Sequence, residues 1–130
     1  MIGLDSSTVI DFFKGDISLK NTLEKIDDPL VLNIVSYLEI MNGINPSNMP
    51  HKKEEIFYDN FFDSFLVFEL NRKNSKKSSE ILWQLKKMGK VIGLSDCAIA
   101  GIYLSNGVNK ILTKNKRHFA NIKGLEVLSY

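Results

Sequence analysis

Hydrophobic positions along the chain fall into short apolar runs that alternate with longer segments of helical periodicity. Short continuous apolar runs are typical of strands buried on both faces of a parallel sheet. They are expected at 1–4 (MIGL), 30–35 (LVLNIV), 65–70 (FLVFEL), 109–113 (NKILT) and 125–129 (LEVLS). Strands that alternate with helices predict an α/β fold with three layers, α/β/α, around a mostly parallel central sheet of about five strands.

The segments between these runs repeat their apolar residues at helical spacing. Helices are expected from about Ser6 to a stop at Gly15, then at 19–26, 37–44, 49–65, 75–88 and 96–105. Ser36 is positioned to cap the helix at 37–44. The polar segment 114–124 (KNKRHFANIKG) separates the last two expected strands.

Size and composition narrow the class of protein. A chain of 130 residues fits one domain, expected to span 1–130. Apolar residues make up 44% and charged residues 25%, which excludes a disordered or fibrous class. No segment resembles a membrane helix or a signal peptide, so a cytoplasmic location without membrane contact is expected. The lone Cys97 cannot build a disulfide framework and is expected to be a small buried residue.

Three acidic residues fall at corresponding places in the predicted fold. Asp5 follows the first strand, Glu39 is expected in the first turn of the helix after the second, and Asp96 begins a later helix. In open α/β sheets, ligand sites form beyond the carboxyl ends of the strands. Three carboxylates at that edge would repel one another unless a cation neutralised them. Oxygen ligands alone favour a hard ion, so Mg²⁺ is expected, with Mn²⁺ as a substitute, and phosphodiester hydrolysis is the natural chemistry.

Each acid also has a purely structural explanation. Acidic residues in first helical turns are stabilised by the helix dipole without any catalytic role. Asp5 fits that explanation least well, because it directly follows an apolar strand. The hydroxyl residues at 6–8 are expected to cap the helix in its place. Asp11, further along, is expected to be an ordinary helix acid.

Four segments resemble the motifs of a known family. They are LDSSTVIDFFKGD, SYLEIMNGI, IGLSDCAIAGIYLSNG and ILTKNKRHFANIKGLEVL. In order and spacing they are similar to the motifs of PIN-domain ribonucleases, most closely the VapC-type toxins of prokaryotic toxin–antitoxin pairs. The resemblance covers nearly the whole chain. It implies a metal-dependent endoribonuclease that cuts RNA, is held inactive by a cognate antitoxin and tends to form a homodimer.

The resemblance also implies roles for individual residues. By position, the metal-binding and catalytic acids are Asp5, Glu39 and Asp96, and the polar residues that shape the site are Ser6, Thr113 and Asn115. Gly43 and Gly93 match positions that look structural. Many relatives carry a fourth acid where this chain has His118, which puts a second metal in doubt. Residues expected near the acids, where they would contact RNA phosphates, are Lys114, Lys116, Arg117 and His118.

The basic residues gather at 72–77, 86–90 and 110–123, while the acids concentrate in the first half, for a net charge of +2. Basic clusters of this kind are also common on plain solvated surfaces.

Large apolar residues are frequent in the first half: Phe12, Phe13, Tyr37, Ile40, Met41, Phe57, Phe61 and Phe62. Most are expected in the core, and the remainder would form a groove for an apolar helix face of an antitoxin.

Two other functions remain open at this point. A PIN-like fold without turnover would bind RNA or a protein partner, as the missing fourth acid permits. A receiver-like phosphoacceptor domain also places carboxylates after parallel strands. It would need an adjacent acidic pair after the first strand, and here Asp5 is followed by two serines.

Overall fold

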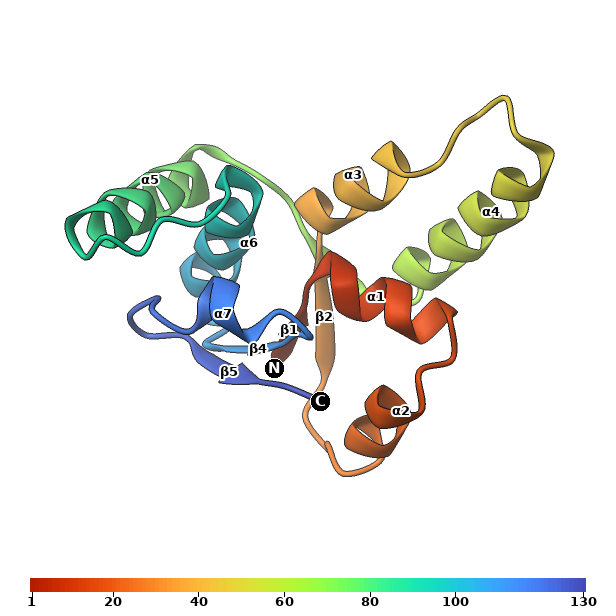
Figure 1. Cartoon of the computed structure of the whole chain (residues 1–130), viewed down its shortest axis with the longest axis horizontal. Coiled ribbons are helices and arrows are strands. Elements are labelled where there is room, and N and C mark those ends of the chain that lie inside the picture. Colours follow the sequence, from red (N-terminus) through yellow and green to blue (C-terminus); the bar gives the residue numbers. More distant parts are fainter.

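The computed structural model describes all residues 1–130. Five short strands form one fully parallel sheet (Figure 1). They are β1 (Ile2–Leu4), β2 (Leu30–Asn33), β3 (Leu66–Phe68), β4 (Lys110–Leu112) and β5 (Glu126–Leu128). Their order across the sheet is β3-β2-β1-β4-β5, and every neighbouring pair is parallel. The expected α/β class and the parallel sheet of five strands are confirmed.

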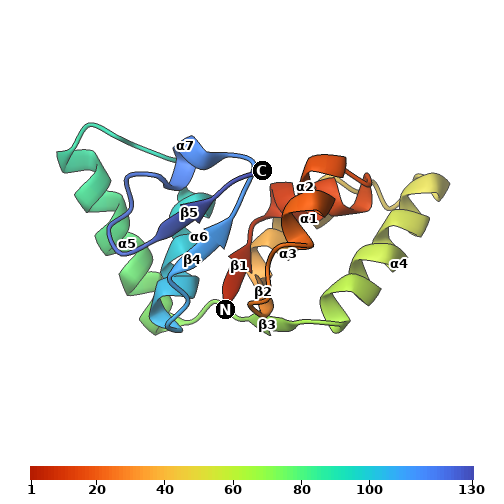
Figure 2. The ribbon, with the colours of Figure 1, turned by 90° about the horizontal axis from the view of Figure 1, so that it is seen from below.

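Seven helices cover the two faces of this sheet. They are α1 (Ser6–Phe13), α2 (Ile17–Leu23), α3 (Ile34–Asn42), α4 (Met49–Asp63), α5 (Arg72–Lys87), α6 (Leu94–Ser105) and α7 (Lys116–Phe119). One hydrophobic core joins α5, α6 and α7 to the sheet, and a second joins α1, α2 and α4 to the opposite face. Figure 2 shows the two groups of helices on either side of the strands. The layers are therefore α/β/α, as predicted.

Alternation along β1 shows how the strands serve both cores. Ile2 and Leu4 pack on the α1 side and are 2% exposed. Gly3 faces the other side, where an added Cβ would lie 2.4 Å from the ring of Tyr103 in α6. The absence of a side chain at Gly3 thus allows α6 to lie directly against the central strand.

The segment 114–124, in which no helix was predicted, contains the short helix α7, anchored by the fully buried Phe119. Two predictions at the start of α3 are wrong. The second strand ends at Asn33 rather than at residue 35, and α3 begins immediately after it. Asn33, not Ser36, is the N-cap, because its side-chain oxygen accepts a hydrogen bond from the Ser36 amide at 2.8 Å.

The strand order reverses at β1. The chain runs outward from β1 through β2 to β3, then returns to the other side of β1 for β4 and β5. In open α/β sheets, such a reversal leaves a crevice beyond the carboxyl ends of the strands on either side of it, here β1 and β4. None of the helices is both long and apolar enough to span a membrane.

Candidate functional site

Asp5 is the first residue after β1 and is only 3% exposed. It is also the N-cap of α1, since its Oδ1 accepts a hydrogen bond from the Thr8 amide at 3.1 Å and one from the Ser7 hydroxyl at 2.8 Å. The expectation that residues 6–8 would cap this helix in its place is therefore wrong. Asp5 serves as the cap and still directs its second oxygen elsewhere.

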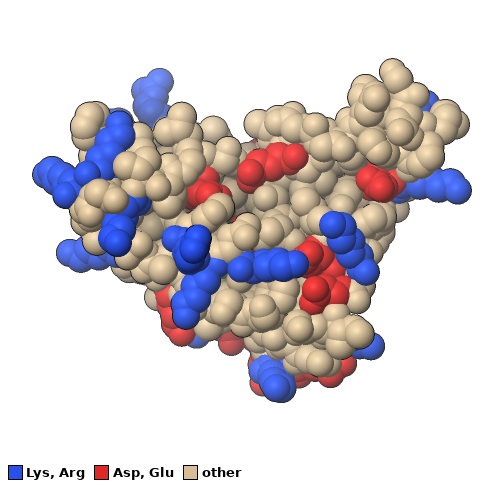
Figure 3. Space-filling model, viewed as in Figure 1, with Lys and Arg blue, Asp and Glu red and all other residues tan.

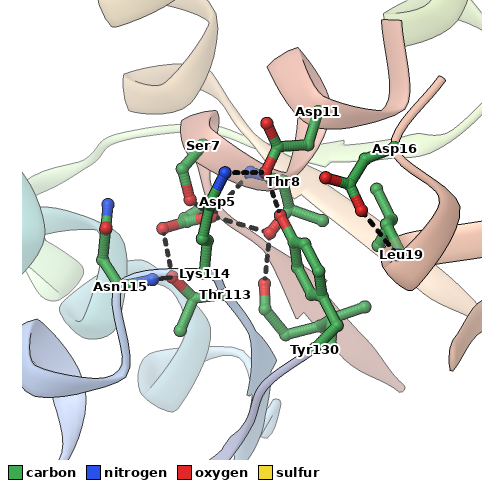
Figure 4. Close-up of polar contacts among 11 residues, drawn as sticks. Asp5, Ser7, Thr8, Asp11, Asp16, Leu19, Thr113, Lys114, Asn115 and Tyr130 are labelled. Atoms are coloured by element: carbon green, nitrogen blue, oxygen red, sulfur yellow. Dashed lines mark hydrogen bonds and ion pairs between the residues drawn. The ribbon is translucent and has the colours of Figure 1, made fainter. Parts of the chain in front are cut away.

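That second oxygen, Oδ2, accepts a hydrogen bond of 2.6 Å from the hydroxyl of Thr113, the residue after β4 (Figure 4). The Thr113 hydroxyl in turn accepts a hydrogen bond from the Asn115 amide at 2.9 Å. The Thr8 hydroxyl lies 3.0 Å from Asp5 Oδ1 and 2.9 Å from the carbonyl oxygen of Leu112. These contacts join the ends of β1 and β4 and fix the orientation of the Asp5 carboxylate.

Glu39 lies in the second turn of α3 rather than at its start. Its Oε1 accepts a hydrogen bond from the Ser6 hydroxyl at 3.2 Å, which ties α3 to the residue beside Asp5. Burial raises the pKa of the Glu39 carboxyl, and the negative charges of Asp96 and Asp5 raise it further, against the opposing effect of the Ser6 hydrogen bond. Asp5 and Asp96 therefore lie close enough to Glu39 for their negative charges to disfavour its ionised form.

Asp96 occupies the first turn of α6, which begins at Leu94. Its Oδ2 lies 2.8 Å from Nδ1 of His118 in α7. Burial raises the pKa of the Asp96 carboxyl, the His118 contact lowers it, and the charge of Asp5 raises it again. His118 is thus the direct partner of a predicted metal ligand.

The sequence analysis missed a buried pair of residues beneath the acids. Tyr103 of α6 and Asn33 at the end of β2 are both fully buried. The Tyr103 hydroxyl donates to the carbonyl oxygen of Leu4 and accepts from Asn33 Nδ2 at 2.9 Å. These two side chains connect the elements that carry Asp5, Glu39 and Asp96. No periodicity in the sequence singles them out.

Asp11 is not the ordinary helix acid that the sequence suggested. It is 7% exposed, and its Oδ2 accepts a hydrogen bond of 2.7 Å from the Tyr130 hydroxyl. Lys114 Nζ lies 3.4 Å from the same oxygen, as Figure 4 shows. The Lys114 ammonium therefore pairs with Asp11, while the preceding residue, Thr113, donates its hydroxyl hydrogen bond to Asp5.

The other predicted basic residues lie beside the acids. Lys116, Arg117 and His118 line an open hollow of about 330 Å³ together with Lys114 and Asn115, and no apolar residue contributes to it. His118 connects this hollow to Asp96. In Figure 3 Lys and Arg side chains gather on the side of α5 and α7, with acidic side chains at the centre of the same face. A polyanion that reached the acids would meet positive charge on this side.

The donor chemistry of this edge fits a hard divalent cation, although the side chains do not form a closed coordination site. No three Asp, Glu, His or Cys side chains lie close enough together to share one ion. Asp5, Asp96 and Glu39 offer only oxygen ligands. Mg²⁺ binds through one or two carboxylates and keeps several waters, so this open arrangement is compatible with it.

We expect the burial of Glu39, together with the repulsion by Asp96 and Asp5, to appear in the pH dependence of stability. Because the folded-state pKa of Glu39 is raised, its contribution is fully present at low pH and is lost as the pH rises through that value. Glu39→Gln should therefore lose less stability than wild type between acidic and neutral pH in the absence of metal. Urea unfolding at several pH values measures this difference, and identical pH profiles would contradict it.

Sequence similarity to a known family extends over almost the whole chain. Residues 2–125 match the PIN domain family. The chain is a PIN domain. The receiver-like alternative is thereby excluded, and the sheet agrees, since receiver domains have the strand order 2-1-3-4-5 and this PIN domain has 3-2-1-4-5.

Solved structures with this fold are similar to the PIN domain over its full length. VapBC2 from Rickettsia felis, bound to a DNA fragment from the promoter of VapBC2, superposes with a TM-score of 0.84 at 19% sequence identity. The match covers 100% of this chain and 99% of the VapBC2 chain. VapBC-1 from nontypeable Haemophilus influenzae gives 0.81 at 22% identity, over 99% and 98%. VapBC-5 from Mycobacterium tuberculosis, a member of the VapBC family of toxin-antitoxin systems, gives 0.77 at 15%, over 99% and 98%. No curated protein matches the chain by sequence.

Proposed function

We propose that this PIN domain is an Mg²⁺-dependent endoribonuclease, with Mn²⁺ as a substitute, and that it is the VapC-type toxin of a toxin–antitoxin pair. The observation that carries the proposal is the convergence of Asp5, Glu39 and Asp96 at one edge of a PIN-domain sheet, where burial and the charges of Asp96 and Asp5 raise the pKa of Glu39. A site that repels its own acids gains most from a divalent cation.

Individual residues then have distinct tasks. Asp5 and Asp96 hold the cation, with Glu39 as a further ligand, directly or through a bound water. When bound, the cation supplies a water of lowered pKa and stabilises charge on the phosphate. Ser6 positions Glu39, while Thr113 and Asn115 orient Asp5. The RNA backbone, which the acids alone would repel, is held by Lys116, Arg117 and Lys114, the last of which is ion-paired with Asp11.

The proposed protein partners, an antitoxin and a second copy of this chain, are inferred from the similarity to VapBC structures and from the apolar side chains that this chain leaves exposed. Solved relatives such as VapBC-5 are described as toxin-antitoxin systems. Phe12 and Phe13 of α1 remain 45% and 38% exposed although they contact Phe61 and Phe57 of α4. Phe12 lines a groove of about 470 Å³ between α1 and α2. We assign this groove to an apolar helix of the antitoxin. We also propose a homodimer that covers Trp83, Met88, Val91 and Leu94, each of which is at least half exposed in the single chain.

Cleavage of total RNA by the purified protein tests the enzymatic proposal. Cleavage is expected with Mg²⁺ or Mn²⁺, and addition of a chelator should abolish it. Retention of full cleavage in the chelator would disprove the metal-dependent mechanism. Co-purification with the product of a small open reading frame directly upstream tests the antitoxin.

His118 provides a prediction that does not depend on cleavage. Its imidazole contacts Asp96 through Nδ1, and loss of a group that orients a metal ligand costs roughly 10–100-fold in metal affinity. His118→Ala should therefore bind Mn²⁺ at least about tenfold more weakly. His118→Asn, whose amide nitrogen can replace Nδ1, should retain most of the affinity. Titration calorimetry compares the three proteins, and equal affinities would remove His118 from the site.

One observation favours the alternative of a PIN-like module that binds RNA or protein with little turnover. No three potential ligands are close enough to share an ion, and both Asp5 oxygens already accept hydrogen bonds. This alternative predicts RNA binding without metal-stimulated cleavage and no measurable binding of Mn²⁺. The calorimetric titration of wild type therefore separates the two functions.

A further inference from the structure

The two halves of the chain differ strongly in charge. Residues 69–130 contain 12 of the 17 Lys and Arg residues but only 4 of the 15 Asp and Glu residues. The first 68 residues therefore have a net negative charge and the remainder a net positive charge. The acids of the site lie where the two halves meet, since Asp5 and Glu39 come from the first and Asp96 from the second.

Part of the positive charge forms a surface that the proposed site does not use. Arg72, Lys73, Lys76 and Lys77 of α5 line an open hollow of about 770 Å³ together with Glu80, Leu104 and Ser105. The only ion pair among them joins Lys77 to Glu80 at 3.7 Å, and both side chains are largely exposed. Arg72, Lys73 and Lys76 form no ion pair. We call these seven residues the α5 basic hollow.

The position of these basic residues opposes the stability of their own helix. Arg72 and Lys73 lie in the first turn of α5, where the helix dipole favours negative charge, and Lys76 and Lys77 follow in the second turn. Arg72 and Lys76 are also like charges four residues apart, as are Lys73 and Lys77, and such pairs destabilise a helix. A charge pattern that is unfavourable for the helix is most simply explained by an anionic ligand.

The backbone beneath the hollow is fixed in place. Asn71 and Asn74 form a reciprocal capping box that sets the start of α5, and Asn74 is 1% exposed. A Cβ added to Gly101 of α6 would lie 2.8 Å from the Asn74 carbonyl oxygen, so the two helix backbones are in direct contact. The basic side chains therefore project from a rigid platform, which reduces the entropy cost of binding.

The α5 basic hollow lies at the far end of α6 from the acids. Asp96 is in the first turn of α6 and Ser105 is its last residue, a separation of about 14 Å along the helix axis. A ligand that bridges the two places must carry repeated negative charges over at least this distance. The backbone of an RNA has this property, since its phosphates follow at a few ångströms from one another.

We propose that the α5 basic hollow binds the sugar–phosphate backbone of the RNA substrate outside the segment that is cut, an inference that rests on the proposed function. The cleaved single-stranded segment lies at Asp5, Glu39 and Asp96. A flanking stem of the same RNA lies along α5, where Lys and Arg neutralise its phosphates. The hollow thus favours folded RNAs over short single strands.

The test compares two charge-reversal variants in a background that cannot cut RNA, Asp5→Asn. Lys73→Glu/Lys76→Glu changes the hollow. Lys52→Glu/Lys53→Glu, on the exposed start of α4 in the acidic half, is the matched control with the same change in net charge. The probes are a fluorescently labelled hairpin RNA, a short single strand with its loop sequence, and a hairpin DNA of equivalent sequence. Fluorescence anisotropy at several salt concentrations gives affinities and salt slopes.

We expect Lys73→Glu/Lys76→Glu to bind the hairpin RNA at least about tenfold more weakly than the control, with a salt slope smaller by up to about 2, and to bind the short strand as the control does. Its melting temperature should rise, because a negative charge at position 73 suits the helix dipole and the two reversals turn the like-charge pairs with Lys77 and Arg72 into opposite-charge pairs. A merely structural role for the lysines predicts a fall in melting temperature instead.

Equal hairpin affinities for the two variants would overturn the inference. An equal loss of affinity for hairpin DNA would overturn the assignment to RNA. Cleavage by the protein with Asp5 intact is scored separately. If that protein cuts no RNA while the hairpin affinities still differ, the proposed function fails and the assignment of the hollow stands.

Discussion

Asp5→Asn is expected to abolish metal-dependent RNA cleavage while leaving the fold intact. Removal of a metal ligand should cost more than the roughly 10–100-fold typical of a residue that only orients one. The fold should persist because asparagine caps helices about as well as aspartate, so its Oδ1 can still accept the Thr8 amide hydrogen bond. In the wild-type protein the Thr113 hydroxyl donates a hydrogen bond to Asp5 Oδ2. In the variant this hydroxyl can rotate and accept a hydrogen bond from the asparagine side-chain amide instead.

Two measurements decide this prediction together. Initial cleavage rates in Mg²⁺ should fall by at least about 100-fold, and the midpoint of urea unfolding should change little. Asp16→Asn is the matched control. Asp16 caps α2 in the same way, through a hydrogen bond from the Leu19 amide at 2.9 Å, but takes no part in the site. Wild-type cleavage by Asp5→Asn would show that this acid is only a helix cap.

Gly3→Ala should destabilise the protein by about 3 kcal/mol or more, the upper part of the range for overpacked cores. The new methyl group would lie 2.4–2.7 Å from three ring atoms of Tyr103. That ring has no room to move, because it is fully buried and its hydroxyl is bonded to Leu4 and Asn33. Urea or thermal unfolding measures the loss.

Gly43→Ala is the matched control for that substitution. Gly43 follows α3 with φ of −86°, and an added Cβ would make only an ordinary contact of 3.4 Å with the Ile40 carbonyl oxygen. Its stability should therefore stay within about 0.5 kcal/mol of wild type or rise slightly. Equal effects at both glycines would mean that contact with Tyr103 is not the reason for Gly3.

These two glycines illustrate what the sequence alone reveals. Gly43 and Gly93 were singled out by resemblance, yet neither has a positive φ or a tight contact. Gly3 and Gly101, which do permit close packing, sit in a strand and in a helix whose apolar pattern gives no sign of it. Strand and helix order follows from local periodicity, whereas close approach of two elements depends on which of them meet in space.

The candidate site divides along the same line. Asp5 and Asp96 could be predicted because the first follows a recognisable strand and the second lies at the start of a helix, and parallel strands bring such positions together. Glu39 was predicted in the first turn of its helix and lies in the second. The contacts of the acids could not be predicted. His118 reaches Asp96, Tyr130 reaches Asp11 and Thr113 reaches Asp5 only after distant segments have folded onto one sheet. The cap formed by Asp5 was not predicted because capping and metal binding were treated as alternatives, although a carboxylate has two oxygens.

The central position of β1 has a consequence for the newly made chain. β1 precedes the other four strands in the sequence, yet one of its two neighbours, β4, contains residues 110–112. While the protein emerges from the ribosome, the second edge of Ile2–Leu4 stays unpaired until β4 has been made. Asp96 and Thr113 also follow Asp5 by about 90 residues or more. A nascent chain is therefore expected to lack an assembled site until Thr113 has left the ribosome.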